Sequence, residues 1–286
     1  MKINKILEQY ENGVSFEFFP PKTDVGMKKL IAKAQILKEY KPLYVSMTYG
    51  AAGVTQERTK EAVFTLLKDK NSTVMPHLTC IGAKEEALKN LLNEYEIAGI
   101  ENIMALRGDP PQGCGNFDFK NQDFCYALDL IKFIKKNYNF CIGAAVYPEG
   151  HIETSSLEQD LEFTKQKVDA GVDFAVTQMF FDNSYYYSFL DRARKSGINI
   201  PILPGILPLT SLDKLKQFIS VCRTTIPKKI EEAMSCFSNS PEDMEKVGID
   251  WTIKQCQGLK ENGDRKLHFF TLNKPEVMAA VLDAIK

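Results

Sequence analysis

Near its start, the sequence contains the stretch Val14-Ser15-Phe16-Glu17-Phe18-Phe19-Pro20-Pro21. Its aromatic and β-branched residues favour a strand, and the two prolines end it because proline cannot donate to a central strand ladder. One carboxylate, Glu17, lies within this apolar run. A buried charge is costly unless it is paired or its pKa changes, so Glu17 is expected at the mouth of a pocket, in an ion pair, or protonated. The alternative is an edge-strand glutamate that faces water.

The rest of the chain alternates short apolar strands with helices that carry an apolar stripe. We expect eight strands, at 14–19, 43–48, 73–79, 102–107, 140–147, 173–179, 200–203 and 266–272. The helices between and after them are expected at 24–37, 55–70, 84–98, 124–137, 156–170, 184–196, 211–221, 227–262 with a break near 238–241, and 275–285. Strict alternation predicts a parallel sheet with right-handed crossovers. Eight units favour a single (β/α)8 TIM-type barrel over residues 1–286, and no G-x-G-x-x-G follows the first strand to support a Rossmann domain.

Composition narrows the class of protein. The 286 residues are 44% apolar and 26% charged, as in ordinary globular proteins. A net charge of -1 gives no electrostatic basis for a nucleic-acid or membrane partner. Seven scattered cysteines without a C-x-x-C pair predict neither a metal site nor a disulfide framework. The first ten residues lack the apolar core of a signal peptide, and prolines interrupt the longest uncharged run, 196–212, so we expect a cytoplasmic protein.

Polar residues follow most of the predicted strands, at the end of a parallel barrel where active sites lie. They are Glu17, Thr48, His77, Thr79, Arg107, Asp109, Tyr147, His151, Gln178, Asn273 and Lys274. Each alone is explained by loop hydrogen bonding, whereas together they predict one shared pocket. Arg107 and Asp109 flank a glycine, where a ligand could approach the backbone. Arg107 suits an anionic group, and the alternative is a turn with an internal ion pair.

Seven motifs in this sequence resemble those of the methylenetetrahydrofolate reductases, in the short bacterial form that consists of the catalytic barrel only. The resemblance runs from about Ser15 to Ala280 and places the motifs at the ends of predicted strands. The motifs are Ser15-Phe16-Glu17-Phe18-Phe19-Pro20-Pro21, Pro76-His77-Leu78-Thr79-Cys80, Leu106-Arg107-Gly108-Asp109-Pro110, Tyr147-Pro148-Glu149-Gly150-His151, Thr177-Gln178-Met179-Phe180-Phe181-Asp182, Pro204-Gly205-Ile206-Leu207-Pro208 and His268-Phe269-Phe270-Thr271-Leu272-Asn273.

The resemblance implies a flavoprotein that binds FAD noncovalently and reduces 5,10-methylenetetrahydrofolate to 5-methyltetrahydrofolate. Electrons would come from NADH or NADPH in a ping-pong scheme, and the product would supply methyl groups for methionine. Homo-oligomerisation is implied by analogy. The flavin-binding positions carried over from the family are Thr48, His77, Leu106, Arg107, Gly108, Asp109, Ala145, Tyr147, His151, Asp160 and Lys167.

The resemblance also assigns catalytic and substrate-binding roles. Glu17 would be the general acid that protonates N10 of the folate, and its phenylalanine neighbours predict a pKa raised by desolvation. Asp109 would tune hydride transfer through its charge. The substrate-binding positions are Glu17, Asp109, Gln178, Lys214, Phe218 and Lys274.

Three features qualify these assignments. Phe218 also fits the apolar stripe of its predicted helix. Lys214 and Lys274 replace a glutamine and an arginine that are familiar in the family. The loop Pro111–Gln122 is longer than in the best-known bacterial members.

Three other functions were compared with the sequence, and each lacks a feature that it requires or predicts. A proline dehydrogenase-like flavin barrel would need an arginine pair in the last helix, which this chain lacks. A non-catalytic folate- or flavin-binding barrel, or an assembly subunit, would be expected to lose Glu17 or Asp109, and both are present. A barrel methyltransferase would need a zinc-binding cysteine cluster, which the scattered cysteines of this sequence do not provide. The choice between NADH and NADPH is left open, because barrel loops lack the ribose-reading acid of Rossmann proteins.

Overall fold

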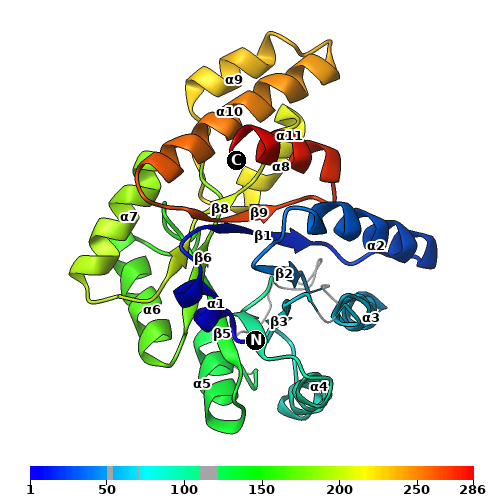
Figure 1. Ribbon diagram of the computed structural model, residues 1–286. Coiled ribbons are helices and arrows are strands. Elements are labelled where there is room, and N and C mark those ends of the chain that lie inside the picture. Colours follow the sequence, from blue (N-terminus) through cyan, green and yellow to red (C-terminus); the bar gives the residue numbers. More distant parts are fainter. Residues whose placement is uncertain (50–53, 70, 110–121) are drawn as a thin grey trace.

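A computed structural model describes residues 1–49, 54–69, 71–109 and 122–286. Over these ranges parallel strands form a nearly closed barrel with helices around it, so the predicted fold is confirmed (Figure 1). The elements are α1 (Ile3–Gln9), β1 (Gly13–Phe18), α2 (Asp24–Lys38), β2 (Tyr44–Met47), α3 (Val54–Leu67), β3 (Val74–Thr79), α4 (Glu85–Ile97), β4 (Asn102–Leu106), α5 (Ala127–Asn137), β5 (Cys141–Val146), α6 (Leu157–Asp169), β6 (Phe174–Thr177), α7 (Asn183–Lys195), β7 (Ile202–Leu203), β8 (Gly205–Ile206), α8 (Leu212–Val221), α9 (Lys228–Ser235), α10 (Pro241–Glu261), β9 (Lys266–Phe270) and α11 (Pro275–Ala284).

The barrel closes at a proline. The strand order is β7-β6-β5-β4-β3-β2-β1-β9-β8, and the two end strands are consecutive in the chain, separated only by Pro204. The sequence predicted one seventh strand at 200–203; the structure instead has two short ones, because proline has no N–H for the ladder. The carbonyl of Pro204 accepts a hydrogen bond from the N–H of His268 at 3.0 Å. The N–H of Gly205 donates to the hydroxyl of Thr177 at 2.8 Å, which joins the other side.

Helix α1 fills the amino-terminal end of the barrel. Its apolar residues Ile3, Ile6 and Leu7 are buried against inward-facing side chains of the strands, among them Tyr44 and Phe174. The sequence shows this segment only as charged and periodic, and no helix was predicted there. Because this end is filled, the interior opens toward the carboxyl ends of the strands, where the polar residues were expected.

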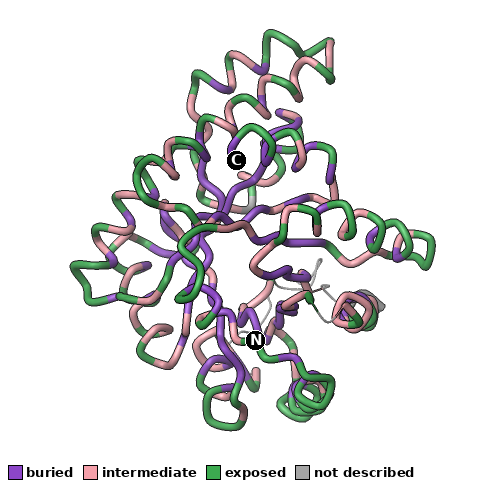
Figure 2. The backbone as a smooth tube through the Cα atoms, viewed as in Figure 1, coloured by how far each residue is buried: buried purple, intermediate pink, exposed green. Residues whose placement is uncertain are grey.

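Strand alternation separates the core into layers. Phe16 and Phe18 belong to the large apolar cluster between the strands and the surrounding helices. Ser15 and Glu17 are also buried and point to the opposite face of β1, which is the barrel interior. Figure 2 shows the buried backbone concentrated in the central strands, with exposed residues on the outer sides of the helices. None of the described helices has the length and apolar character needed to cross a bilayer.

The close packing where the barrel closes predicts that Gly205→Ala lowers the stability of the fold. A Cβ at this position would lie 2.2 Å from the backbone oxygen of Thr177 and 2.9 Å from the ring of Phe270. We expect a loss of about 1–3 kcal/mol in the free energy of unfolding, measured by urea denaturation. The matched control is Gly258→Ala in α10, where the new Cβ would meet only the end of the Asn183 side chain at 3.1 Å. Equal stability of the two variants would contradict the role assigned to Gly205.

Candidate active site

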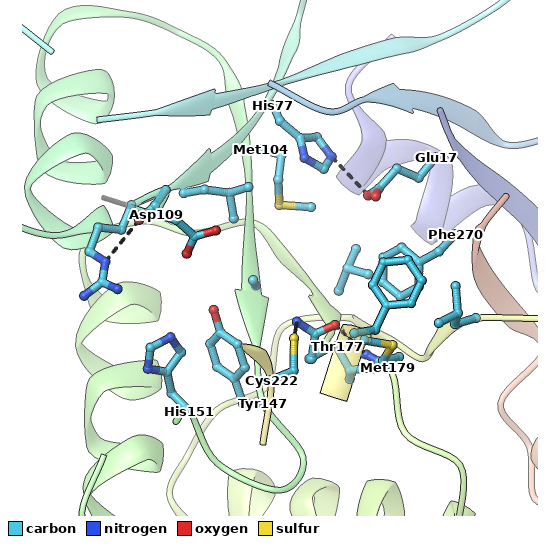
Figure 3. A pocket seen from close by; sticks show the side chains of 18 of the residues that line it. Glu17, His77, Met104, Asp109, Tyr147, His151, Thr177, Met179, Cys222 and Phe270 are labelled. Atoms are coloured by element: carbon cyan, nitrogen blue, oxygen red, sulfur yellow. Dashed lines mark hydrogen bonds and ion pairs between the residues drawn. The ribbon is translucent and has the colours of Figure 1, made fainter. Parts of the chain in front are cut away.

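A pocket of about 480 Å³ lies at the carboxyl ends of the strands. Apolar side chains such as Met104, Ala145 and Val176 line it together with charged and polar groups. In the close view, Glu17 and His77 lie at one side of the cavity, and Tyr147 and His151 lie at another (Figure 3). The predicted site residues that line the pocket are Glu17, His77, Leu106, Arg107, Gly108, Asp109, Ala145, Tyr147, His151, Gln178 and Phe218.

The most buried charged group in the pocket is Glu17, which faces two histidines. Its Oε2 lies 3.3 Å from Nε2 of His77 and 3.6 Å from Nε2 of His268. His268 is fully buried; its Nδ1 lies 2.8 Å from the Ser15 hydroxyl and 3.2 Å from the Tyr44 hydroxyl. The ring of Tyr44 is stacked on that of His268, with centroids 5.7 Å apart. This packing fixes one imidazole beside the carboxylate.

The expected rise in the pKa of Glu17 is wrong. Burial alone would raise it, but the charge of His77 and the hydrogen bond and charge of His268 outweigh burial and hold the pKa below its usual value. The expectation rested on Phe16, Phe18 and Phe19. The side chains of Phe16 and Phe18 pack in the outer core, and of the three only Phe19 lines the pocket with Glu17. Burial also lowers the pKa of His77, against the opposing effect of the Glu17 charge. The carboxylate and imidazole therefore titrate as a coupled pair.

The turn after β9 holds the end of β1 in place. The hydroxyl of Thr271 donates to the carbonyl of Glu17 at 2.6 Å. The Asn273 side chain donates to the carbonyl of Phe19 and accepts from its N–H. Leu272 and Asn273 have φ values of 50° and 53°, so this turn has left-handed backbone where a longer strand was predicted.

The end of β4 presents an anion next to a paired cation. Asp109 is exposed at the pocket, while Arg107 forms a bidentate ion pair with Glu153, with N–O distances of 2.5 and 2.7 Å. Gly108 has φ 86°, and a Cβ there would lie 2.8 Å from Cβ of Thr79. The left-handed backbone and the close approach of β3 therefore both require glycine at position 108. The sequence had suggested only that a glycine lets a ligand approach the backbone.

Tyr147 and His151 form one wall, with their ring centroids 4.8 Å apart. Behind them, the buried ammonium of Lys167 donates to the carbonyl of Ala145 at 2.7 Å and lies 5.9 Å from the Tyr147 ring centroid. Burial lowers the pKa of Lys167 to about 8, although the charge of Asp160 opposes this. Asp160 accepts a hydrogen bond from the N–H of His151 at 3.0 Å. Lys167 and Asp160 thus support the wall without lining the pocket.

Five other predicted residues lie outside the pocket lining: Thr48, Thr79, Lys214, Asn273 and Lys274. Thr48 follows β2, where its N–H donates to the carbonyl of Phe18. Lys214 is exposed on α8, and Lys274 forms an ion pair with Glu245 at 3.0 Å. Of the loop Pro111–Gln122, all but Gln122 lies outside the described residues.

Sequence reasoning missed several contributors to the site. Glu153, His268 and Cys222 were assigned no role; Cys222 lies one residue beyond the helix predicted at 211–221 and caps α8. Phe270 and Leu272 also line the pocket and belong to a motif whose residues were not assigned individually. Its position directly after the helix that carries Phe218 is the signal that could have identified Cys222.

A parallel barrel with a polar pocket at the carboxyl ends of its strands, and a buried carboxylate beside imidazoles, has the architecture of a barrel enzyme. The chain matches the family described as methylenetetrahydrofolate reductase over residues 2–286. It belongs to the methylenetetrahydrofolate reductase family, which confirms the resemblance seen in its motifs.

Individual relatives agree with this assignment. The chain is 37% identical over 268 residues to the 5,10-methylenetetrahydrofolate reductase of Pectobacterium carotovorum subsp. carotovorum, covering 94% of this chain and 88% of that protein. It is 35% identical to methylenetetrahydrofolate reductase (NADH) 1 of Arabidopsis thaliana, covering 98% of this chain and 49% of the plant protein. Among solved structures, an uncharacterized protein from Clostridium thermocellum that binds two copies of 5-methyl-5,6,7,8-tetrahydrofolic acid shares the fold, with a TM-score of 0.66, 14% identity and coverage of 99% and 98% of the two chains.

The contacts of Glu17 with His77 and His268 predict how the stability of the fold depends on pH. A carboxyl whose folded pKa lies below its usual 4.5 stabilises the fold above that pH, and this contribution is lost as the pH falls through the folded pKa. We expect the stability difference between wild type and Glu17→Gln to shrink as the pH is lowered from about 6 to about 3. Urea denaturation at each pH measures it, with the exposed Glu96→Gln on α4 as control. A difference that stays constant with pH would contradict the lowered pKa.

Proposed function

We propose that the chain is an FAD-dependent reductase that converts 5,10-methylenetetrahydrofolate to 5-methyltetrahydrofolate with electrons from NADH or NADPH. The observation that carries the proposal is the Glu17 carboxylate held by two histidines at one side of the pocket, across from Tyr147, His151 and Asp109. Membership of the family supports reduction of methylenetetrahydrofolate, and the relatives from Pectobacterium and Arabidopsis are methylenetetrahydrofolate reductases.

The pocket suits a noncovalently bound flavin ring. Its volume of about 480 Å³ falls within the usual range for small-molecule sites, and its lining mixes apolar and polar groups. His77 lines the pocket, and its buried Nε2 makes no hydrogen bond beyond its contact with the Glu17 carboxylate at 3.3 Å, so a polar edge of the flavin ring could join this pair. FAD would supply hydride transfer between the nicotinamide and the folate. The residues proposed to hold it are Thr48, His77, Leu106, Arg107, Gly108, Asp109, Ala145, Tyr147, His151, Asp160 and Lys167.

Glu17 is proposed as the acid that opens the folate. A proton passes to N10, the bond between the methylene carbon and N10 breaks, and the electron pair stays on N10. The resulting N5 iminium then accepts hydride at the methylene carbon. Because the pKa values of Glu17 and His77 are both lowered in this structure, the assignment requires the pKa of Glu17 to rise when bound folate removes the remaining water from the pocket. Asp109 would stabilise the cationic iminium through its charge.

The remaining substrate contacts are proposed in the same pocket. Gln178 and Phe218 line it and would contact either substrate in turn, in a ping-pong scheme. Lys214 and Lys274 lie beyond the lining, so they would meet only an extended, negatively charged tail of the folate. Lys274 would have to leave Glu245 to do so.

The proposal extends to the cellular setting. We propose that residues 1–286 form one catalytic, flavin-binding domain that acts as a homo-oligomer in the cytoplasm. Its partners would be small molecules, with neither nucleic acid nor membrane among them. Its product would supply methyl groups for methionine.

The variant Glu17→Gln distinguishes the two half-reactions of the ping-pong scheme, which are reduction of the flavin by NADH and reduction of methylenetetrahydrofolate by the flavin. Without the acid, reduction of methylenetetrahydrofolate should fall by at least about a hundredfold, while oxidation of NADH in the presence of an artificial electron acceptor stays near wild type. Anaerobic stopped-flow measurement of each half-reaction tests this, with Glu96→Gln as control. Equal losses in both half-reactions would remove Glu17 from the role of acid.

Asp109→Asn tests the charge near the reacting groups. We expect the folate half-reaction to slow by about ten- to a thousandfold, because one placed charge is lost where the cation forms. The matched control is Asp213→Asn, at an exposed position on α8. Unchanged folate kinetics in Asp109→Asn would exclude Asp109 from the reaction.

A further inference from the structure

The side chain of Gln178 is fixed at both ends. Gln178 follows β6, and its backbone N–H donates to the carbonyl of Val146 at 2.7 Å. Its Oε1 accepts a hydrogen bond from the N–H of Met179 at 2.9 Å. A backbone N–H can only donate, so the end of the carboxamide that faces Met179 must be the oxygen. The amide nitrogen is therefore at the other end, 3.3 Å from the sulfur of Cys222.

The position of Cys222 is also fixed by its surroundings. It caps the carboxyl end of α8, and its N–H donates to the carbonyl of Ile219. Its own carbonyl accepts from the N–H of Thr224 at 2.9 Å, and the Thr224 hydroxyl donates to the carbonyl of Met179 at 3.2 Å. The end of α8 is thus tied to the residue that follows Gln178. Cys222 and Gln178 cannot separate without breaking these bonds.

Cys222 is an uncharged hydrogen-bond acceptor in the pocket lining. Burial raises the pKa of its thiol, and the charge of Asp109 adds to that effect. The sulfur therefore stays protonated at neutral pH and accepts the amide N–H as a neutral group. Figure 3 shows Cys222 on the same side of the cavity as Thr177 and Met179, the residues that flank Gln178.

We propose that Cys222 is a positioning residue that holds the amide nitrogen of Gln178 in place. With Oε1 held by Met179 and one amide hydrogen held by Cys222, the second amide hydrogen remains for a ligand. The site then selects ligands that present a hydrogen-bond acceptor, such as the carbonyl oxygen of a nicotinamide carboxamide or of a pterin ring. This inference rests on the proposed function and adds a specificity-determining contact to it.

Cys222→Ala and Cys222→Ser separate the hydrogen bond from simple packing. Loss of one neutral hydrogen bond should raise KM for methylenetetrahydrofolate and for NADH by about three- to tenfold in the alanine variant, with a smaller effect on kcat. Serine keeps an acceptor and should restore most of the loss. Cys236→Ala, at the exposed cap of α9, is the matched control and should leave both constants unchanged. A serine variant as impaired as the alanine variant would overturn the proposal.

A double-mutant cycle tests whether Cys222 acts through Gln178. In a Gln178→Ala background, Cys222→Ala should cause no further rise in KM, because no carboxamide remains to be positioned. Rises in KM that multiply independently would overturn the positioning role.

The orientation of the Gln178 carboxamide is tested with reduced 3-acetylpyridine adenine dinucleotide, which keeps the carbonyl oxygen but lacks the amide NH₂ of nicotinamide. The rise in KM caused by Cys222→Ala should be the same with this donor as with NADH. A rise that disappears with the analogue would show that the ligand's NH₂ is recognised instead. An active wild type with an unaffected Cys222→Ala variant would overturn this inference alone, whereas a wild type that reduces no methylenetetrahydrofolate would overturn the proposed function as well.

Discussion

The site depends on one carboxylate that is kept inside the barrel by two imidazoles. Glu17 is buried, and its burial would be unfavourable without His77 and His268 within 3.3 and 3.6 Å. Hydroxyl groups of Ser15 and Tyr44 in turn fix His268. The result is a carboxylate paired with two imidazoles, at a pocket that is closed below by α1 and open above.

The barrel brings these groups together because each lies at a defined place on a strand. Inward-facing positions of β1, β3 and β9 place Glu17, His77 and His268 at neighbouring points of one interior surface. The same geometry requires the sheet to close between β6 and β9, and Pro204 with Gly205 achieves this in a very short segment. Closure of the barrel and assembly of the site are therefore parts of one structural constraint.

The sequence predicted what depends on local periodicity. Strand and helix alternation is a local signal, so the barrel and the pocket at the carboxyl ends of its strands could be predicted. Contacts between residues that are distant in the sequence could not be predicted in this way. Alternation along β1 directs Phe16 and Phe18 away from Glu17, and the histidine from β9 that lowers its pKa is distant in the sequence. The pairing of Arg107 with Glu153 likewise depends on how a loop folds back.

The proposed function requires this pocket to hold a flavin that passes electrons from a nicotinamide to a folate. The most direct measurement is the visible absorption spectrum of the purified, FAD-reconstituted protein under anaerobic conditions, recorded before and after NADH and again after methylenetetrahydrofolate. We expect a yellow protein that bleaches with NADH and recovers its colour with the folate. A protein that takes up no FAD, or one whose colour the folate fails to restore, would contradict it.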